Sequence, residues 1–119
     1  MFKNEKQQSD VTKEFSEISI EQLRKYCSED KIFATNHAAE RFRERKISVR
    51  DIYNAINCGE IIEQYPNDYP YPSCLILGKN LRGEEIHTVL SDEGTASRII
   101  TAYFPDVDKW SADFKVRRQ

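Results

Sequence analysis

Residues 48–65, SVRDIYNAINCGEIIEQY, contain the point at which the chain changes from helical to strand patterning. Before Gly59 the apolar residues recur at helical spacing, and Ser48 followed by Asp51 three positions later is typical of a helix start. Gly59 stands where a helix is expected to end, because the left-handed conformation at that position favours a residue without a Cβ. The next residues, 60–65, combine two isoleucines with a tyrosine and predict a strand.

Two further helices are predicted upstream of this point. Ser19 and Gln22 form a capping pattern for a helix that continues to about Glu29. After the short link KIFAT, a second helix is expected from about residue 36 to residue 46. Residues 1–17 are polar and show no sustained periodicity, so we expect them to form a flexible tail.

The later part of the chain is patterned as strands and turns. Short hairpins favour antiparallel pairing of these strands. Trp110 and Phe114, four residues apart, predict a short closing helix. Because the helices precede the strands, the sequence predicts an α+β fold in which N-terminal helices pack on a four-stranded antiparallel sheet. The three strands expected after the first lie at 74–80, 84–92 and 97–104.

The size and composition of the chain suit one domain, expected over residues 18–119. A division of 119 residues into two domains would leave neither with an adequate core, while the 39% hydrophobic content is enough for one. No apolar run approaches the roughly 20 residues of a membrane span, and the first residues lack the apolar stretch of a signal peptide. We therefore expect a cytoplasmic domain that contacts no membrane.

Neither a metal nor another cofactor is expected. The three cysteines are odd in number and form no CxxC pair, which argues against a disulfide framework or a structural zinc site. The two histidines lie far apart in the sequence, with no metal-ligand pattern around them. A nucleotide-binding fold is also excluded, because the chain has four glycines and no glycine-rich loop.

Charge is distributed unevenly, although the net charge is only −2. Basic residues dominate segments 31–50 and 109–119, and acidic residues dominate the long segment between them. The low net charge argues against non-specific coating of nucleic acid. If folding brings the two basic segments together, they form a local anion site; otherwise both are solvated surfaces.

The helix expected at 36–46 carries the sharpest candidate for a catalytic site. At 100° per residue, His37, Arg41 and Arg45 fall on one edge, while apolar residues occupy the opposite side. An imidazole can move a proton near neutral pH, and guanidiniums can stabilise developing negative charge, which together suit phosphodiester cleavage. The alternative is a surface helix whose arginines pair with glutamates one turn away.

Three residues outside this helix are further candidates. His87 lies mid-strand and is a candidate second proton-transfer group, although a histidine half-buried in the sheet and bonded to a neighbour is the favoured alternative. Tyr103, near the end of the last strand, can bind a phosphate, stack on a base or simply pack. Arg117 adds to the cationic cluster if the basic tail docks beside the helix.

The segment YPNDYPYPS, residues 65–73, places tyrosines between stiff prolines. Aromatic rings on a rigid loop can stack unpaired bases or cover the edge of a sheet, and the second role is the expectation here. Ser73 lies outside any GxSxG context, so a serine hydrolase is excluded.

Four stretches, TNHAAERFRERKIS, CGEIIEQYPNDYPYPSCLILG, EIHTVL and IITAYFPDVDKWSADFKVRR, occur in this order within residues 35–118. Together they resemble a bacterial family described only as domain of unknown function 4258, which is similar in helix-then-sheet layout to the RelE/ParE-like toxin ribonucleases. The resemblance implies a metal-independent endoribonuclease of a toxin–antitoxin pair, with RNA as substrate and a cognate antitoxin protein as partner. The family's recurring polar positions correspond here to His37, Arg41, Arg45, Tyr65, Pro72, Ser73, His87, Tyr103 and Arg117.

Two functions follow as hypotheses. The first is an endoribonuclease in which His37, Arg41 and His87 are catalytic. Its substrate-binding residues are Arg45, Tyr65, Ser73, Tyr103 and Arg117. The second is a non-catalytic module in which the acidic middle of the chain and the aromatic loop contact a partner protein, and the histidines are structural. The histidine and arginine edge favours the first hypothesis and the acidic charge favours the second; the first is the one we expect.

Overall fold

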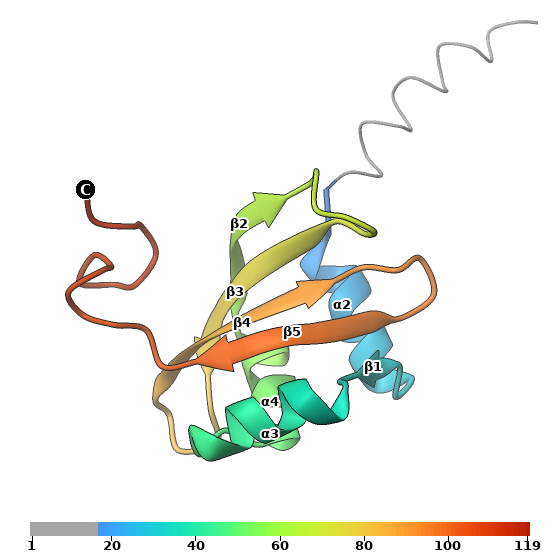
Figure 1. The fold of residues 1–119 in the computed structure, drawn as a ribbon, viewed down its shortest axis with the longest axis horizontal. Helices are drawn as coiled ribbons and strands as arrows, with labels where there is room; N and C mark the ends of the chain where they lie inside the picture. The colour runs from blue at the N-terminus through green and yellow to red at the C-terminus, as the bar shows by residue number, and fades with distance from the viewer. Residues whose placement is uncertain (1–16) are drawn as a thin grey trace, which may run out of the picture.

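The computed structural model describes residues 17–119 (Figure 1). The flexible tail predicted over residues 1–17 lies outside this range except for Glu17. The predicted α+β class and its three N-terminal helices are confirmed. The elements are α2 (Ile20–Ser28), β1 (Ile32–Phe33), α3 (Asn36–Glu44), α4 (Val49–Cys58), β2 (Glu60–Tyr65), β3 (Ser73–Lys79), β4 (Glu85–Ser91) and β5 (Ser97–Tyr103).

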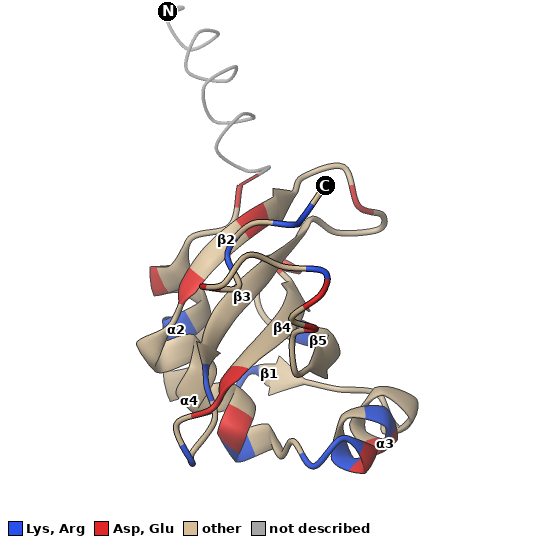
Figure 2. Cartoon of the chain, turned by 90° about the vertical axis from the view of Figure 1, so that its left-hand side faces the viewer, with Lys and Arg blue, Asp and Glu red and all other residues tan. Residues whose placement is uncertain are grey.

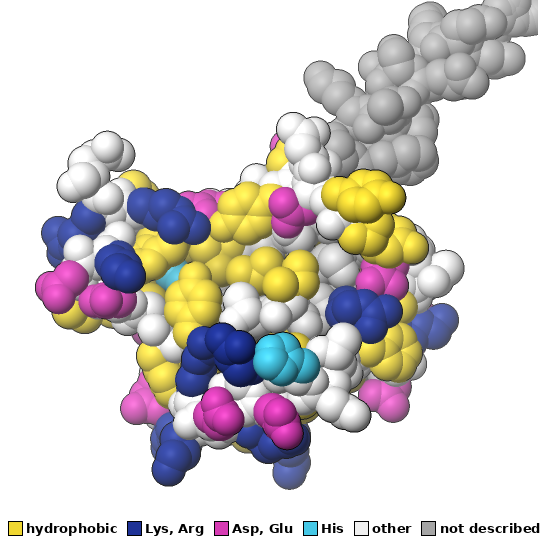
Figure 3. Space-filling view, in the orientation of Figure 1, with side chains coloured by type: hydrophobic (Ala, Val, Ile, Leu, Met, Phe, Trp, Pro, Cys, Tyr) yellow, Lys and Arg dark blue, Asp and Glu magenta, His cyan; other side chains and the backbone are white. Residues whose placement is uncertain are grey.

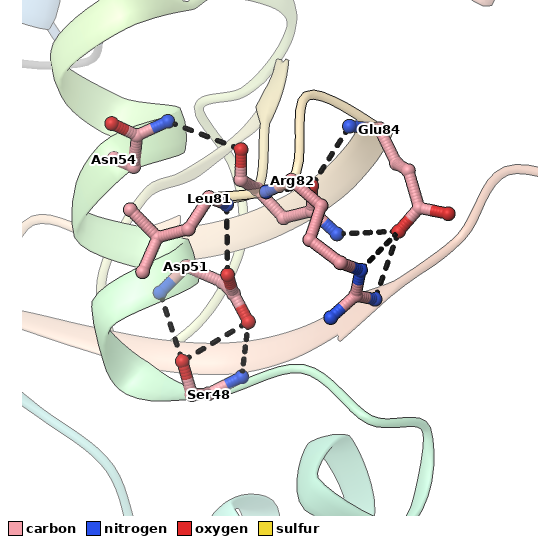
Figure 4. Close-up of polar contacts among 7 residues, drawn as sticks. Ser48, Asp51, Asn54, Leu81, Arg82 and Glu84 are labelled. Carbon is pink, nitrogen blue, oxygen red and sulfur yellow. Dashed lines mark hydrogen bonds and ion pairs between the residues drawn. The ribbon is translucent and has the colours of Figure 1, made fainter.

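Each helix begins at a hydroxyl side chain that caps it. Ser19, Thr35 and Ser48 accept hydrogen bonds from backbone N–H groups three residues later, which satisfies part of each first turn. At α4 the cap is reciprocal, because the Asp51 carboxylate accepts the backbone N–H of Ser48. The other Asp51 oxygen accepts the N–H of Leu81 at 2.9 Å, so α4 is tied to the turn between β3 and β4 (Figure 4).

The strands form one sheet in the order β1-β5-β4-β3-β2. From β2 to β5, consecutive strands pair antiparallel, as predicted. The expected total of four strands is wrong, because the link before α3 contributes the two-residue β1, which pairs in parallel with β5 through Ile32 and Ser97. So short a strand has no periodicity by which the sequence could reveal it.

The hydrophobic core lies on one face of this sheet. Helix α4 packs along β3, and α2 packs against α4. Helix α3 lies along β5 instead, where it contributes Phe42 to the core (Figure 1). The strand residues that point into the core alternate along β3 and β4, while a register shift between β4 and β5 sets those of β5 three residues apart; together they include Cys74, Ile76, Ile86, Leu90, Ile99 and Ala102. The residues between them point to the other face.

Two glycines allow α4 to approach β3 closely. A Cβ at Gly59 would collide with the carbonyl oxygens of Leu77 and Ala55, and a Cβ at Gly78 would collide with the backbone of Ala55. The left-handed conformation predicted for Gly59 is wrong, since its φ is −103°. Glycine is required there by crowding between the helix end and the strand.

The closing helix predicted from Trp110 and Phe114 is also wrong. Residues 105–119, called here the C-terminal segment, fold back irregularly and are joined by a bridge between Trp110 and Arg117. Phe114 has a φ of 63°, which a right-handed helix cannot contain. Trp110 is nonetheless buried, so the aromatic side chain anchors an irregular segment on the sheet.

Candidate functional site

No helix within residues 17–119 covers the face of the sheet opposite the core, and we call it the open face (Figure 1). Its side chains alternate with those of the core and include Leu75, His87, Val89 and Tyr103. Helix α3 borders it along β5, and the C-terminal segment covers the end near β2 and β4 (Figure 1). In the space-filling view, apolar side chains lie at the centre of this face and basic side chains lie around it (Figure 3).

Helix α3 presents a histidine and two arginines along the border of the open face. His37 Nε2 lies 3.4 Å from Arg41 Nη1. Because a guanidinium can only donate, this contact makes Nε2 the acceptor and leaves the imidazole proton on Nδ1. Arg45 Nη1 donates to the carbonyl of Ala102 at 2.9 Å and to Thr101 Oγ1 at 3.2 Å, which ties the end of α3 to β5.

The glutamates of α3 do not neutralise these arginines. Among residues 17–119, no ion pair joins Glu40 or Glu44 to an arginine of this helix. A hollow of about 330 Å³ lies between α3 and β5, bordered by His37 and Arg41 on one side and Arg98 to Thr101 on the other. An exposed imidazole and an unneutralised guanidinium therefore line the same hollow, as an anion-binding catalytic site requires.

His87 lies on the open face but is fully buried beneath the C-terminal segment. Its Nε2 lies 2.9 Å from the carbonyl oxygen of Phe114, so this nitrogen carries the proton and donates it. The Trp110 ring meets the imidazole edge-on, with 4.4 Å between ring centroids, and the Tyr103 hydroxyl lies 3.4 Å from Nδ1. Burial lowers the pKa of His87 below its usual value of 6.5.

The C-terminal segment is held down by Arg117. Its guanidinium makes a two-pronged ion pair with Glu63 of β2, with contacts of 3.0 Å, and stacks 4.6 Å above the Trp110 ring. The Tyr65 hydroxyl also donates to Glu63. Burial would raise the pKa of Glu63, but the hydrogen bonds from Arg117 and Tyr65 outweigh it and the pKa lies below its usual range. Burial, reinforced by Glu63, raises the pKa of Tyr65 to about 12.

Tyr103 lies in β5 between the end of α3, which carries Arg45, and the C-terminal segment, which carries Arg117. Its half-buried ring meets the His87 ring edge-on, and burial raises the pKa of its hydroxyl. Its neighbour Ala102 accepts the hydrogen bond from Arg45, and the Tyr103 hydroxyl lies 3.4 Å from Nδ1 of His87, which the C-terminal segment covers.

The match to a known family covers the elements that build this face. A family model described as a domain of unknown function (DUF4258) matches residues 34–104, from the start of α3 to the end of β5. The chain belongs to this DUF4258 family. No curated protein and no solved structure matches it significantly.

In this DUF4258 domain the predicted site residues separate into three groups. His37, Arg41 and Arg45 lie together on α3, as helical spacing predicted. A second group surrounds the anchor of the C-terminal segment and consists of Tyr65, His87, Tyr103 and Arg117. Ser73 belongs to neither, because it is buried and donates its hydroxyl hydrogen bond to Asp68.

The basic segments of this DUF4258 domain do not merge into one anion site. Figure 2 shows basic residues on α3 and on the C-terminal segment, at separate places on the domain. Arg117 is paired with Glu63, which sequence reasoning missed because the partners are far apart in the chain and neither belongs to a motif. The contact of Trp110 with His87 likewise had no signal in the sequence.

The described part of the DUF4258 domain offers no grouped metal ligands. Within residues 17–119, no three side chains of histidine, cysteine, aspartate or glutamate are arranged to hold a metal ion. None of the helices in that range has the length and apolar character needed to cross a membrane.

Proposed function

We propose that this chain is an endoribonuclease that cleaves single-stranded RNA without a metal ion, using His37 and Arg41 of α3. The observation that carries the proposal is the exposed His37 imidazole, whose Nε2 lies 3.4 Å from a guanidinium that no glutamate of the helix neutralises. A base and a cation side by side at a hollow are the two groups that cleavage by the 2′-hydroxyl needs.

The reaction uses the neighbouring 2′-hydroxyl as the nucleophile. Arg41 turns from His37 to the phosphoryl oxygens, which frees Nε2 of His37 to accept the 2′-hydroxyl proton while the O2′–P bond forms and the P–O5′ bond breaks. Arg41 stabilises the negative charge that develops on the phosphoryl oxygens, and water supplies the proton for the leaving O5′. The products are a 2′,3′-cyclic phosphate and a 5′-hydroxyl end.

His87 has a different place in this proposal from the one its sequence position suggested. Because Phe114 and Trp110 cover its ring, we assign His87 to holding Tyr103 and the C-terminal segment in position. Tyr103 and Arg45 then serve as substrate-binding groups beside α3, where a hydroxyl and a guanidinium can each contact a phosphate.

We further propose that the enzyme is the toxin of a toxin–antitoxin pair, acting in the cytoplasm, with a cognate antitoxin protein as its partner. The support is the resemblance of the sequence to a family similar in layout to the RelE/ParE-like toxin ribonucleases, for which helices followed by an antiparallel meander are the expected order of elements. The cysteines among the described residues, Cys27, Cys58 and Cys74, are all free, as suits a reducing compartment.

The test is cleavage of a mixed-sequence RNA in the presence of EDTA, alone and with ribosomes. His37→Ala is expected to lower the rate by about 10²–10⁴-fold and Arg41→Ala by about 10²–10³-fold, because each removes a group used in the transition state. Arg43→Ala is the matched control, since Arg43 is exposed on the other side of the same helix. The products should carry 2′,3′-cyclic phosphates, and DNA of the same sequence should stay intact. Full activity of the folded His37→Ala variant would remove His37 from the mechanism.

A non-catalytic protein-binding module is the second candidate function. The observation that favours it is a set of exposed apolar side chains after β5, at Phe104, Val107 and Val116. This function predicts a stable complex with a partner protein that survives His37→Ala but is weakened by Val107→Asp. Absence of RNA cleavage, together with such a complex, would make it the better account.

A further inference from the structure

A second hollow lies on the open face, between the β2–β3 loop and β5. It measures about 630 Å³, within the range of about 300–1,000 Å³ typical of small-molecule sites. Its walls include Tyr69 and Tyr71 from the loop and Arg98 and Ile100 from β5. Arg98 and Ile100 also border the hollow beside His37 and Arg41, so the two hollows adjoin along β5.

The tyrosine side chains of the loop are exposed. Tyr69 is 94% exposed and Tyr71 is 42% exposed, so the expectation that these rings cover a sheet edge is wrong for Tyr69. The neighbouring prolines restrict the backbone, and the N–H of Asp92 donates to the carbonyl of Pro72 at 3.1 Å. Figure 3 shows the resulting apolar cluster at the upper right of the open face, over this loop. Because the backbone of the loop is already restricted, less conformational entropy is lost than in a flexible loop when a flat ligand stacks on its rings.

The charged side chains in this hollow determine whether it can bind an anion or an uncharged ligand. Asp68 and Glu93 contribute carboxylates to its wall, and Arg98 is paired with Glu93 at 2.8 Å. Carboxylates repel a phosphate, whereas the hollow beside α3 presents Arg41 without a paired carboxylate. An uncharged flat group fits the tyrosine hollow, and an anion fits the adjoining one.

We infer that the tyrosine hollow is a base-binding subsite, in which an unpaired base of single-stranded RNA stacks on Tyr71 and Tyr69 while the neighbouring phosphate lies beside Arg41. This inference deepens the proposed function and takes the identity of the ligand from it. Bases inside a duplex are already paired and stacked, so only a single strand offers a ring to this hollow. The two adjoining hollows thus hold one nucleotide's base and the phosphate next to it.

The test measures binding separately from cleavage. The full chain is titrated into a fluorescently labelled RNA hexamer that carries 2′-O-methyl groups and cannot be cut by its own hydroxyls, and into the same hexamer with abasic residues. Tyr71→Ala is expected to weaken binding of the base-containing hexamer by about 5- to 100-fold, because loss of one stacked base has that cost. Tyr69→Ala should act in the same direction, while Tyr69→Phe and Tyr71→Phe keep the ring and should bind within about two-fold of wild type.

Two controls decide whether the effect belongs to the base. The abasic hexamer should bind wild type and Tyr71→Ala equally, because neither then has a base to stack. Leu81→Ala removes another exposed apolar side chain, in the β3–β4 turn, and should leave the affinity unchanged.

The outcomes separate this inference from the proposed function. Equal affinity of wild type and both alanine variants for the base-containing hexamer would overturn the inference alone. Base-dependent binding without cleavage of ordinary RNA would support the subsite and overturn the ribonuclease. Failure of every RNA to bind would overturn both.

Discussion

His37 and His87, the two histidines of the chain, differ in burial and in contacts, the properties that decide whether a histidine can exchange a proton with a substrate. His37 is exposed on α3 beside an arginine, whereas His87 is sealed between Trp110, Tyr103 and the carbonyl of Phe114. The mid-strand position of His87 in the sequence could not reveal its burial. The residues that cover it belong to the C-terminal segment, which the sequence predicted as a helix. Burial and partners therefore assign the proton-transfer role to His37 and a positioning role to His87.

The burial of His87 predicts a loss of stability in mild acid. Its pKa in the folded chain is below 6.5, so the unfolded chain binds a proton first as the pH falls. The contribution of neutral His87 is complete above about pH 7.5 and is lost as the pH falls through 6.5 towards the folded-state pKa. Urea unfolding at pH 7.5 and pH 5.5 should show wild type losing at most about 1.4 kcal/mol more than His87→Gln, whose amide can still donate to Phe114. The same pH dependence in both proteins would contradict this origin.

Among the polar residues, Asp51 is the one whose replacement is expected to destabilise the fold most. It accepts the N–H groups of Ser48 and Leu81 at once, at the start of α4 and in the β3–β4 turn (Figure 4). Burial would raise the pKa of Asp51, but these hydrogen bonds outweigh it and the pKa lies below its usual value.

Asp51→Ala is expected to lower the free energy of unfolding by about 2 kcal/mol, because a helix cap is lost and the part-buried N–H of Leu81 is left without a partner. Chemical denaturation measures it. Arg82→Ala is the control, because it removes the exposed guanidinium paired with Glu84 in the same turn and keeps the hydrogen bond from Asn80 to Glu84; it should cost less than about 1 kcal/mol. Equal losses in the two variants would mean that the cap is not the source of the effect.

At the scale of elements, the sequence predicted the features that depend on residues close together in the chain. The caps at Ser19 and Ser48 and the spacing of His37, Arg41 and Arg45 were readable because each depends on residues within one or two turns. The two-residue β1 and the pairing of Glu63 with Arg117 were not readable, because both depend on contacts across more than 50 positions. The spacing of Trp110 and Phe114 misled, since one buried aromatic in an irregular segment produces the same pattern as a helix face.

The ion pair between Arg117 and Glu63 predicts how the C-terminal segment opens. Arg117→Ala removes that pair and the cation over the Trp110 ring, so the segment should leave the sheet more often. Trp110 is the only tryptophan, so its fluorescence should shift to longer wavelength and become more accessible to acrylamide. Lys115→Ala is the control. Lys115 lies in the same C-terminal segment and pairs with Glu60 of β2, but this ion pair is exposed and contributes little to stability. An unchanged tryptophan signal in the folded Arg117→Ala protein would show that the segment is held by packing alone.

At the scale of the whole molecule, charge constrains how RNA is held. A chain of net charge −2 has no general attraction for nucleic acid, so affinity must come from the few arginines that border the open face. Among residues 17–119, Arg41 and Arg45 of α3 have no paired carboxylate, whereas Arg98 and Arg117 are neutralised by Glu93 and Glu63. Two phosphates is therefore the expected number of ionic contacts.

That number predicts a shallow salt dependence. For single strands the slope of log affinity against log salt is about −0.7 per neutralised phosphate, so binding of the 2′-O-methyl hexamer should give a slope of about −1.4 between 50 and 200 mM salt. Arg41→Ala should make the slope shallower by about 0.7, because it removes one contact, and Arg43→Ala should leave it unchanged. A slope steeper than about −4, unaffected by Arg41→Ala, would mean that RNA coats the surface of the protein instead of binding in the two adjoining hollows. Combined with the loss of base stacking in Tyr71→Ala, a shallow slope would mean that this acidic domain holds RNA largely through stacked bases.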